Sequence, residues 1–242
     1  MTVREAASAN GFRVVTAASQ LTGLVRGERV LGLFSSSTMP VRLRGAGGAR
    51  AELVMRDENG SVIPPEPFSC EPHPDFAGMP TLAAMSRAAL DQLDDGRSFM
   101  LMIESASIDK QSHARRPCGQ IGEVEQLDET LALVLDYVRT HPETLVLVTA
   151  DHGQAAKLVP ERSVYSVLNY ASPGHFARVR TLEGGIMGIN YATNDSPLQE
   201  DHSGVQVPLF ASGPGVDDLP AMVPQTEIYT ITARHLGLGT RR

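Results

Sequence analysis

The stretch IESASIDKQSHA, from Ile103 to Ala114, groups two carboxylates and an imidazole within a few residues. Glu104 comes at the end of an apolar run, Asp109 follows five residues later, and His113 four residues after that. Burying such groups without partners costs several kcal/mol, so they need either a solvated surface or a metal ion. The rest of the sequence has to decide between these two environments.

Two downstream motifs carry the same residue types. TADHG places Asp151 and His152 just after a second apolar run, and EDHSG places His202 just before a third. Taken singly, each of these residues is explained more simply as a helix cap or a surface histidine. Functional residues of open α/β sheets, however, gather where strands end, so all three clusters are expected at one sheet edge.

The chemistry of this combined set favours a multi-metal site. Imidazole nitrogen and carboxylate oxygen are the ligands expected for zinc, whereas Glu104, a hard oxygen donor, suits magnesium. Two zinc ions about 4 Å apart could serve an in-line displacement at phosphorus.

The apolar pattern predicts the elements that position these residues. Phe99–Glu104 and Thr144–Ala150 are short continuous apolar runs, as expected for buried strands. Between them, apolar residues recur at helical spacing: Val124, Leu127, Leu131, Val134, Leu135 and Val138. This order predicts a right-handed βαβ unit with parallel strands and helices on both faces of the sheet. The expected fold class is α/β.

Outside this unit the sequence predicts two more strands and two more helices. The strands are expected at Glu28–Phe34 and Val207–Gly215, and the helices at Thr81–Leu93 and Glu227–Leu236. From about Gly45 to Gly78 the chain is rich in glycine and proline and has little periodicity, which indicates a loop-rich excursion rather than a linker. We therefore expect a single domain over residues 1–242.

Composition narrows the function classes. With 242 residues, 42% hydrophobic and 20% charged, the chain is typical of a soluble globular protein. A net charge of -7 argues against nucleic acid as a partner and favours small molecules. No apolar stretch is long enough to span a bilayer, and the opening MTVREAASAN lacks the features of a signal peptide. Taken literally, these features predict a cytosolic protein.

The two cysteines leave the redox compartment open. Cys70 lies in PPEPFSCEPHP and Cys118 in RRPCGQIG, both next to prolines. Their spacing does not distinguish a disulfide from two free thiols.

Several motifs together resemble the alkaline phosphatase family. The segments ESASIDKQSHA, PCGQIGE, LVLVTADHG and EDHSG stand in the order of that family's carboxy-terminal metal motifs, with similar separations. LGLFSSSTMPVR and PTLAAMSRAAL match family segments that bind no metal, so the resemblance covers nearly the whole chain. It implies a three-layer sandwich with a mostly parallel sheet, incomplete at the amino-terminal side.

The resemblance also implies a role for each candidate residue. Glu104 would bind magnesium, and the two zinc sites would be held by Asp109, His113 and His202 and, incompletely, by Asp151 and His152. Lys110 stands where bacterial members place a lysine that reaches the substrate phosphate. Cys70 and Cys118 match a disulfide of the bacterial enzymes, which favours a bridge.

Two departures from the family pattern affect the expected activity. The family's nucleophilic serine in an Asp-Ser-Ala motif, its phosphate-binding arginine and its bridging aspartate have no counterpart here, and the tripeptide DSA does not occur. The chain is therefore expected to be the carboxy-terminal half of such an enzyme, without a catalytic nucleophile and inactive alone. Gln154 replaces a histidine that many members carry beside the zinc ligands, a change that tunes metal affinity.

The function implied for the intact enzyme is hydrolysis of phosphate monoesters through a phosphoserine, with two zinc ions and one magnesium ion. Such a full-length enzyme would be periplasmic or secreted and homodimeric. Two alternatives remain: a sulfatase or mutase of the same superfamily, and a non-catalytic metal-binding protein. The DKQSH spacing argues against the first, and the missing nucleophile favours the second.

Overall fold

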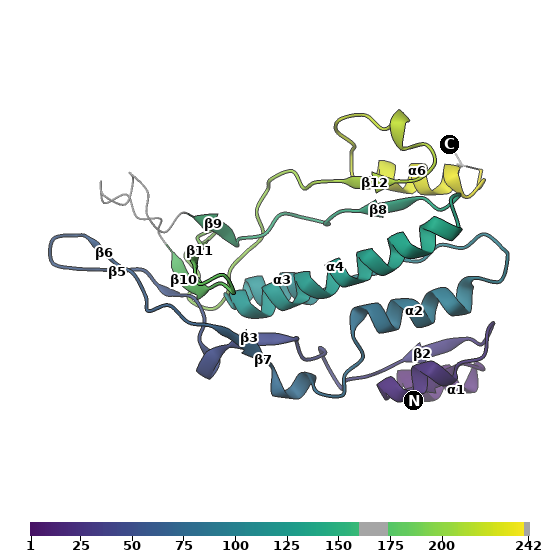
Figure 1. Cartoon of the computed structure of the whole chain (residues 1–242), viewed down its shortest axis with the longest axis horizontal. Coiled ribbons are helices and arrows are strands. Elements are labelled where there is room, and N and C mark those ends of the chain that lie inside the picture. The colour runs from purple at the N-terminus through teal and green to yellow at the C-terminus, as the bar shows by residue number, and fades with distance from the viewer. Residues whose placement is uncertain (160–173, 240–242) are drawn as a thin grey trace.

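The computed structural model describes residues 1–159 and 174–239, in which helices and short strands are mixed (Figure 1). The long helix α4 (Pro117–Thr140) runs through the middle of the molecule, and α2 (Leu82–Leu93), α3 (Ser107–His113) and β3 (Leu43–Gly45) pack against it. The remaining helices are α1 (Val3–Ala9) and α6 (Glu227–His235). The α/β fold class is confirmed, and the predicted helices correspond to α2, α4 and α6. No described helix has both the length and the apolar character needed to cross a membrane.

Strand pairing differs from the prediction. Among the described residues, the one parallel pair of strands is β1 (Arg13–Val15) with β2 (Val30–Gly32). β8 (Val146–Val148) pairs antiparallel with β12 (Phe210–Ser212). These two strands lie within Thr144–Ala150 and Val207–Gly215, so both of those predicted strands are confirmed.

The predicted strand at Phe99–Glu104 is wrong, and with it the parallel βαβ unit. The segment has no assigned strand, and no described residue forms a ladder with it. Its side chains alternate in exposure, with Met100 63% and Met102 77% exposed. Because a strand requires hydrogen bonds to a neighbouring strand, an apolar run without such a neighbour stays merely extended.

A four-stranded antiparallel sheet, in the order β4-β10-β11-β9, lies on the left of Figure 1, away from α6. Its strands are β4 (Glu52–Leu53), β10 (His175–Arg180), β11 (Ile186–Tyr191) and β9 (Lys157–Val159). Residues from β10 and β11 join the start of α4 in the hydrophobic core, where Tyr191 is fully buried and donates a hydrogen bond from its hydroxyl to Gln120.

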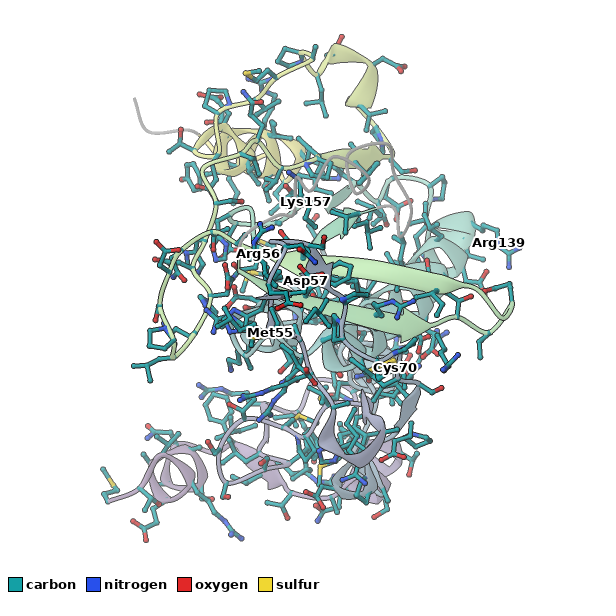
Figure 2. All side chains as sticks on the ribbon, turned by 90° about the vertical axis from the view of Figure 1, so that its left-hand side faces the viewer. Met55, Arg56, Asp57, Cys70, Arg139 and Lys157 are labelled. Carbon is teal, nitrogen blue, oxygen red and sulfur yellow. A yellow bond between two sulfur atoms is a disulfide. The ribbon has the colours of Figure 1, made fainter. Side chains whose placement is uncertain are left out.

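The loop-rich segment from about Gly45 to Gly78 contains short strands and two short 3-10 helices, Ala46–Gly48 and Pro74–Phe76. β3 pairs with β7 (Cys70–Pro72), and β5 (Met55–Arg56) with β6 (Val62–Ile63). The β5–β6 hairpin extends from one end of the molecule, and Figure 2, viewed from that end, shows Met55, Arg56 and Asp57 nearest the viewer. Met55 is 60% exposed, so the hairpin contributes little to the core.

Helix α4 buries a polar stripe. Glu123 and Gln126 are buried, whereas Val124 and Leu135 are 48% and 42% exposed. The Glu123 carboxylate accepts hydrogen bonds from the Arg42 backbone and the Gln126 amide, and Gln126 in turn accepts one from the Leu82 backbone at the start of α2. These hydrogen bonds compensate the buried polar groups, which explains why apolar periodicity alone does not identify the buried face.

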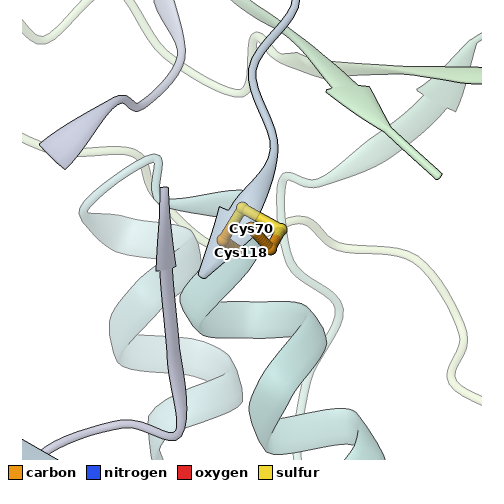
Figure 3. Close-up of a disulfide and its surroundings, with 2 residues drawn as sticks. All are labelled: Cys70 and Cys118. Carbon is orange, nitrogen blue, oxygen red and sulfur yellow. A yellow bond between two sulfur atoms is a disulfide. The ribbon is translucent and has the colours of Figure 1, made fainter. Parts of the chain in front are cut away.

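The disulfide between Cys70 and Cys118 joins β7 to the first turn of α4 (Figure 3) and confirms the pairing implied by the resemblance. Cys118 belongs to the hydrophobic core, and Cys70 packs against it. It closes a loop with a sequence separation of 48 residues. On the chain-entropy model, such a bridge stabilises the folded state by roughly 3 to 4 kcal/mol.

Removing this bridge is therefore expected to lower the free energy of unfolding by roughly 3 to 4 kcal/mol. Urea unfolding of the oxidised protein and of the double variant Cys70→Ala/Cys118→Ala measures the difference. Thiol titration of the unfolded, unreduced protein is the control, with no free thiol expected. Two titratable thiols would contradict the bridge.

Candidate metal centre

Helix α3 places Asp109 and His113 on one face, because residues four apart lie one turn above each other. Asp109 Oδ1 and His113 Nε2 are 3.3 Å apart. His202, from the loop after β11, adds its Nε2 atom 3.7 Å from Asp109 Oδ1 and 3.0 Å from His113 Nε2. One possible ligand atom from each of these residues lies within 4.8 Å of the others, so we call Asp109, His113 and His202 the triad.

The triad is open to solvent on one side. The side chains of Asp109 and His113 are 36% and 22% exposed, and that of His202 is 46% exposed. An ion could therefore reach the three ligand atoms.

His152, which follows β8, lies beside the triad. Its ring stacks on that of His202 with the centroids 3.6 Å apart, and its Nε2 atom is 3.9 Å from Asp109 Oδ1. Asp151 is 81% exposed, and its Oδ2 atom lies 3.6 Å from His152 Nε2. The structure thus brings five of the six predicted ligands into one continuous cluster: Asp109, His113, His202, His152 and Asp151.

Gln154 contacts this cluster directly. Its side-chain amide donates a hydrogen bond to Asp109 Oδ1, while its carbonyl oxygen accepts one from the Ala155 backbone. The second contact fixes the orientation of the amide, so Gln154 holds the Asp109 carboxylate in place.

Glu104 and Lys110 are less closely connected to the triad. In the described ranges, Glu104 forms no hydrogen bond or ion pair with any residue of the cluster, and it is exposed. Lys110 is also exposed, with its Nζ atom 3.5 Å from the Thr38 hydroxyl. Their predicted roles on magnesium and substrate phosphate remain predictions.

Sequence reasoning missed a buried ion pair behind the triad, between Arg115 and Glu200. Burial raises the pKa of the Glu200 carboxyl, but hydrogen bonds from Arg115 and Thr193 outweigh this effect and hold the pKa below its ordinary value. The two residues are 85 positions apart, so no local spacing pattern could have revealed the pair. The one available signal was that Glu200 lies within the EDHSG motif.

Comparison with known proteins identifies relatives along most of the chain. A family model described as alkaline phosphatase matches residues 2–172. Alkaline phosphatase H of Pseudomonas aeruginosa is 35% identical over 98% of this chain and 47% of its own length. Streptomycin-6-phosphate phosphatase of Streptomyces griseus is 36% identical over 98% of this chain and 51% of its own length. The chain therefore spans about half the length of these relatives.

Solved structures show the same fold. The alkaline phosphatase from the Antarctic bacterium TAB5 aligns with 98% of this chain and 55% of its own, with a TM-score of 0.66 and 18% sequence identity. A mutant of that enzyme with magnesium bound aligns with 99% of this chain and 56% of its own, with a TM-score of 0.63 and 18% identity.

Proposed function

The chain belongs to the alkaline phosphatase family, and we propose that it provides most of the metal ligands of a site that hydrolyses phosphate monoesters. The observation that carries this proposal is the triad, in which two imidazoles and a carboxylate converge from α3 and from a loop nearly ninety residues further along the chain. A coincidental surface cluster of this composition, at these family motifs, would need three separate explanations.

The donor set of the triad fits zinc. His113 Nδ1 lies 2.5 Å from the backbone carbonyl oxygen of Glu200. Because a carbonyl oxygen can only accept, Nδ1 carries the proton and the lone pair of Nε2 is left for a metal. Two imidazole nitrogens and one carboxylate oxygen with solvent access match a zinc site that keeps an open position.

In this proposal each residue of the cluster has a defined task. The triad would hold one zinc ion, Asp151 and His152 would provide part of a second zinc site, and Glu104 would bind magnesium. Gln154 orients the Asp109 carboxylate, and Lys110 would bind the substrate phosphate. A zinc ion bound here would supply Lewis-acid stabilisation of charge on the phosphoryl group.

Among the residues that the structure describes, none is a candidate nucleophile at the triad. Within the described part of the chain, no serine hydroxyl forms a hydrogen bond with Asp109, His113 or His202. We therefore propose that the nucleophilic serine, the phosphate-binding arginine and the bridging aspartate come from sequence outside these 242 residues. The alternative of a non-catalytic metal-binding protein makes the same prediction for zinc but not for turnover.

The disulfide bears on localisation. Structural disulfides persist in oxidising compartments such as the periplasm and the extracellular space. The bridge between Cys70 and Cys118 therefore supports a periplasmic or secreted enzyme. For the full-length form we propose a homodimer, as the family resemblance implies.

The substrate class can be tested in a mixture of this chain with the amino-terminal half of the Pseudomonas aeruginosa relative. With zinc and magnesium at alkaline pH, the mixture is expected to hydrolyse an aryl phosphate and to leave the matched aryl sulfate intact. Release of the same phenol from both esters is measured by absorbance. Preferential hydrolysis of the sulfate would favour a sulfatase and contradict the proposed substrate.

A further inference from the structure

We propose that the buried pair of Arg115 and Glu200 is a positioning device that fixes His113 and His202 for metal binding. The inference deepens the proposed function, because it rests on the triad as a metal site. It concerns two residues that do not themselves belong to the triad.

The pair is buried and linked by hydrogen bonds to the loop from Thr193 to Glu200. The side chains of Arg115 and Glu200 are 6% and 0% exposed, and Arg115 Nε donates to Glu200 Oε2 over 2.7 Å. Glu200 Oε1 accepts from both the backbone and the hydroxyl of Thr193. Arg115 Nη2 also donates to the Ser196 carbonyl over 2.6 Å. Because a buried charge without its partner is strongly destabilising, these contacts leave the loop from Thr193 to Glu200 little freedom.

Glu200 transmits this restraint to both histidines through its backbone. Its N–H donates to the His113 carbonyl over 2.9 Å, and its carbonyl accepts from His113 Nδ1. His202 lies only two residues further along the same loop. The Thr193 hydroxyl, which donates to the Glu200 carboxylate, also accepts a hydrogen bond from the Asp201 backbone N–H. The buried Glu200 carboxylate therefore anchors the backbone segment that positions the imidazole rings of His113 and His202.

Arg115 holds the other end of the device at the exit of α3. Its φ of 55° is the one positive value for a residue other than glycine in the described part of the chain. Residues other than glycine rarely adopt this backbone conformation, and it persists where the surrounding structure imposes it. The Arg115 carbonyl accepts a hydrogen bond from the Ala51 backbone, so the turn that follows His113 is held on both sides by the pair and by the core.

A group that orients a metal-binding histidine typically changes metal affinity by about 10- to 100-fold when it is removed. Glu200→Gln preserves the shape of the side chain but leaves the Arg115 charge without its counter-ion. We expect this variant to bind zinc about 10- to 100-fold more weakly than the wild type. Thr193→Val removes the hydroxyl that binds the carboxylate and the Asp201 N–H, but it keeps the Thr193 backbone N–H and the Arg115 ion pair. It should shift the affinity in the same direction by a smaller factor.

Glu123→Gln is the matched control. Glu123 is also a buried, hydrogen-bonded glutamate, but its partners are the Arg42 backbone and Gln126 on α4 rather than residues of the triad loop. Both glutamine variants lose a buried charge, so a general loss of stability affects both. Only the Glu200 variant is expected to lose zinc affinity.

Two measurements test the inference. Zinc affinity is determined by competition with a chromophoric chelator for the wild type, Glu200→Gln, Thr193→Val and Glu123→Gln. In the metal-free proteins, ¹⁵N NMR of the His113 ring reports which nitrogen carries the proton. The Nδ1–H form should predominate in the wild type and in Glu123→Gln, and should be depleted in Glu200→Gln.

The outcomes separate this inference from the proposed function. Unchanged affinity and an unchanged His113 tautomer in folded Glu200→Gln would overturn the positioning role and leave the metal site intact. A wild type that binds no zinc would overturn the metal assignment and, with it, the inference. If Glu200→Gln does not fold, the same two readouts on Thr193→Val decide, and wild-type behaviour of that variant would overturn the proposal.

Discussion

The chain alone is expected to hydrolyse an aryl phosphate more slowly than its mixture with an amino-terminal half of a relative, by on the order of 10⁴-fold or more. On the proposed function, three cooperating groups would come from the other half of the enzyme: the serine that forms the phosphoenzyme, the arginine that orients the phosphoryl group and the aspartate that bridges two metals. Removing one member of such a set costs nearly as much as removing all, so the residual rate should be small whatever metals are bound.

The measurement is release of an aryl alcohol at alkaline pH with zinc and magnesium, for the chain alone and for the mixture. The control is the mixture made with His113→Ala, which should be as slow as the chain alone. Rapid turnover by the chain alone, with stoichiometric phosphate trapped on one of its own serines, would contradict the proposal and identify a nucleophile within the 242 residues.

His113→Ala is expected to reduce bound zinc from about one equivalent to a small fraction of it, because catalytic zinc sites rely on three protein ligands and this variant loses one. The lost ligand is also the one whose Nε2 lies 3.0 Å from His202 Nε2. Metal analysis after exhaustive dialysis against metal-free buffer measures the change.

Two variants serve as controls for that loss. His141→Ala removes a histidine at the end of α4 that stacks on Tyr137, away from the triad, and should retain the zinc. Glu104→Gln should also retain it, since among the described residues Glu104 forms no hydrogen bond or ion pair with the triad. Equal zinc content in the wild type and His113→Ala would refute the assignment.

The part of the site that could be predicted from sequence is the identity of its ligands. Asp109 and His113 stand out by residue type and spacing, but α3, the helix that carries both, was not among the predicted helices. The apolar periodicity does predict α4. The disulfide between Cys70 and Cys118, by contrast, was predicted from the family resemblance, because the spacing of two cysteines does not show whether they form a bridge.

The features that were not predicted depend on distant residues. Phe99–Glu104 has the composition of a strand, but a strand forms only where a neighbour supplies the hydrogen bonds. The buried face of α4 is decided by the hydrogen bond from Arg42 to Glu123, across 81 positions. Glu200 likewise acquires its role from Arg115, 85 positions away, which no local pattern encodes.

Anomalous diffraction at the zinc edge from crystals grown with zinc locates the ion without reference to activity, and so tests the proposed metal site itself. We expect a peak about 2.0 to 2.2 Å from the Nε2 atoms of His113 and His202 and from a carboxylate oxygen of Asp109. A fully occupied zinc peak elsewhere in the molecule, with none at these three side chains, would contradict it.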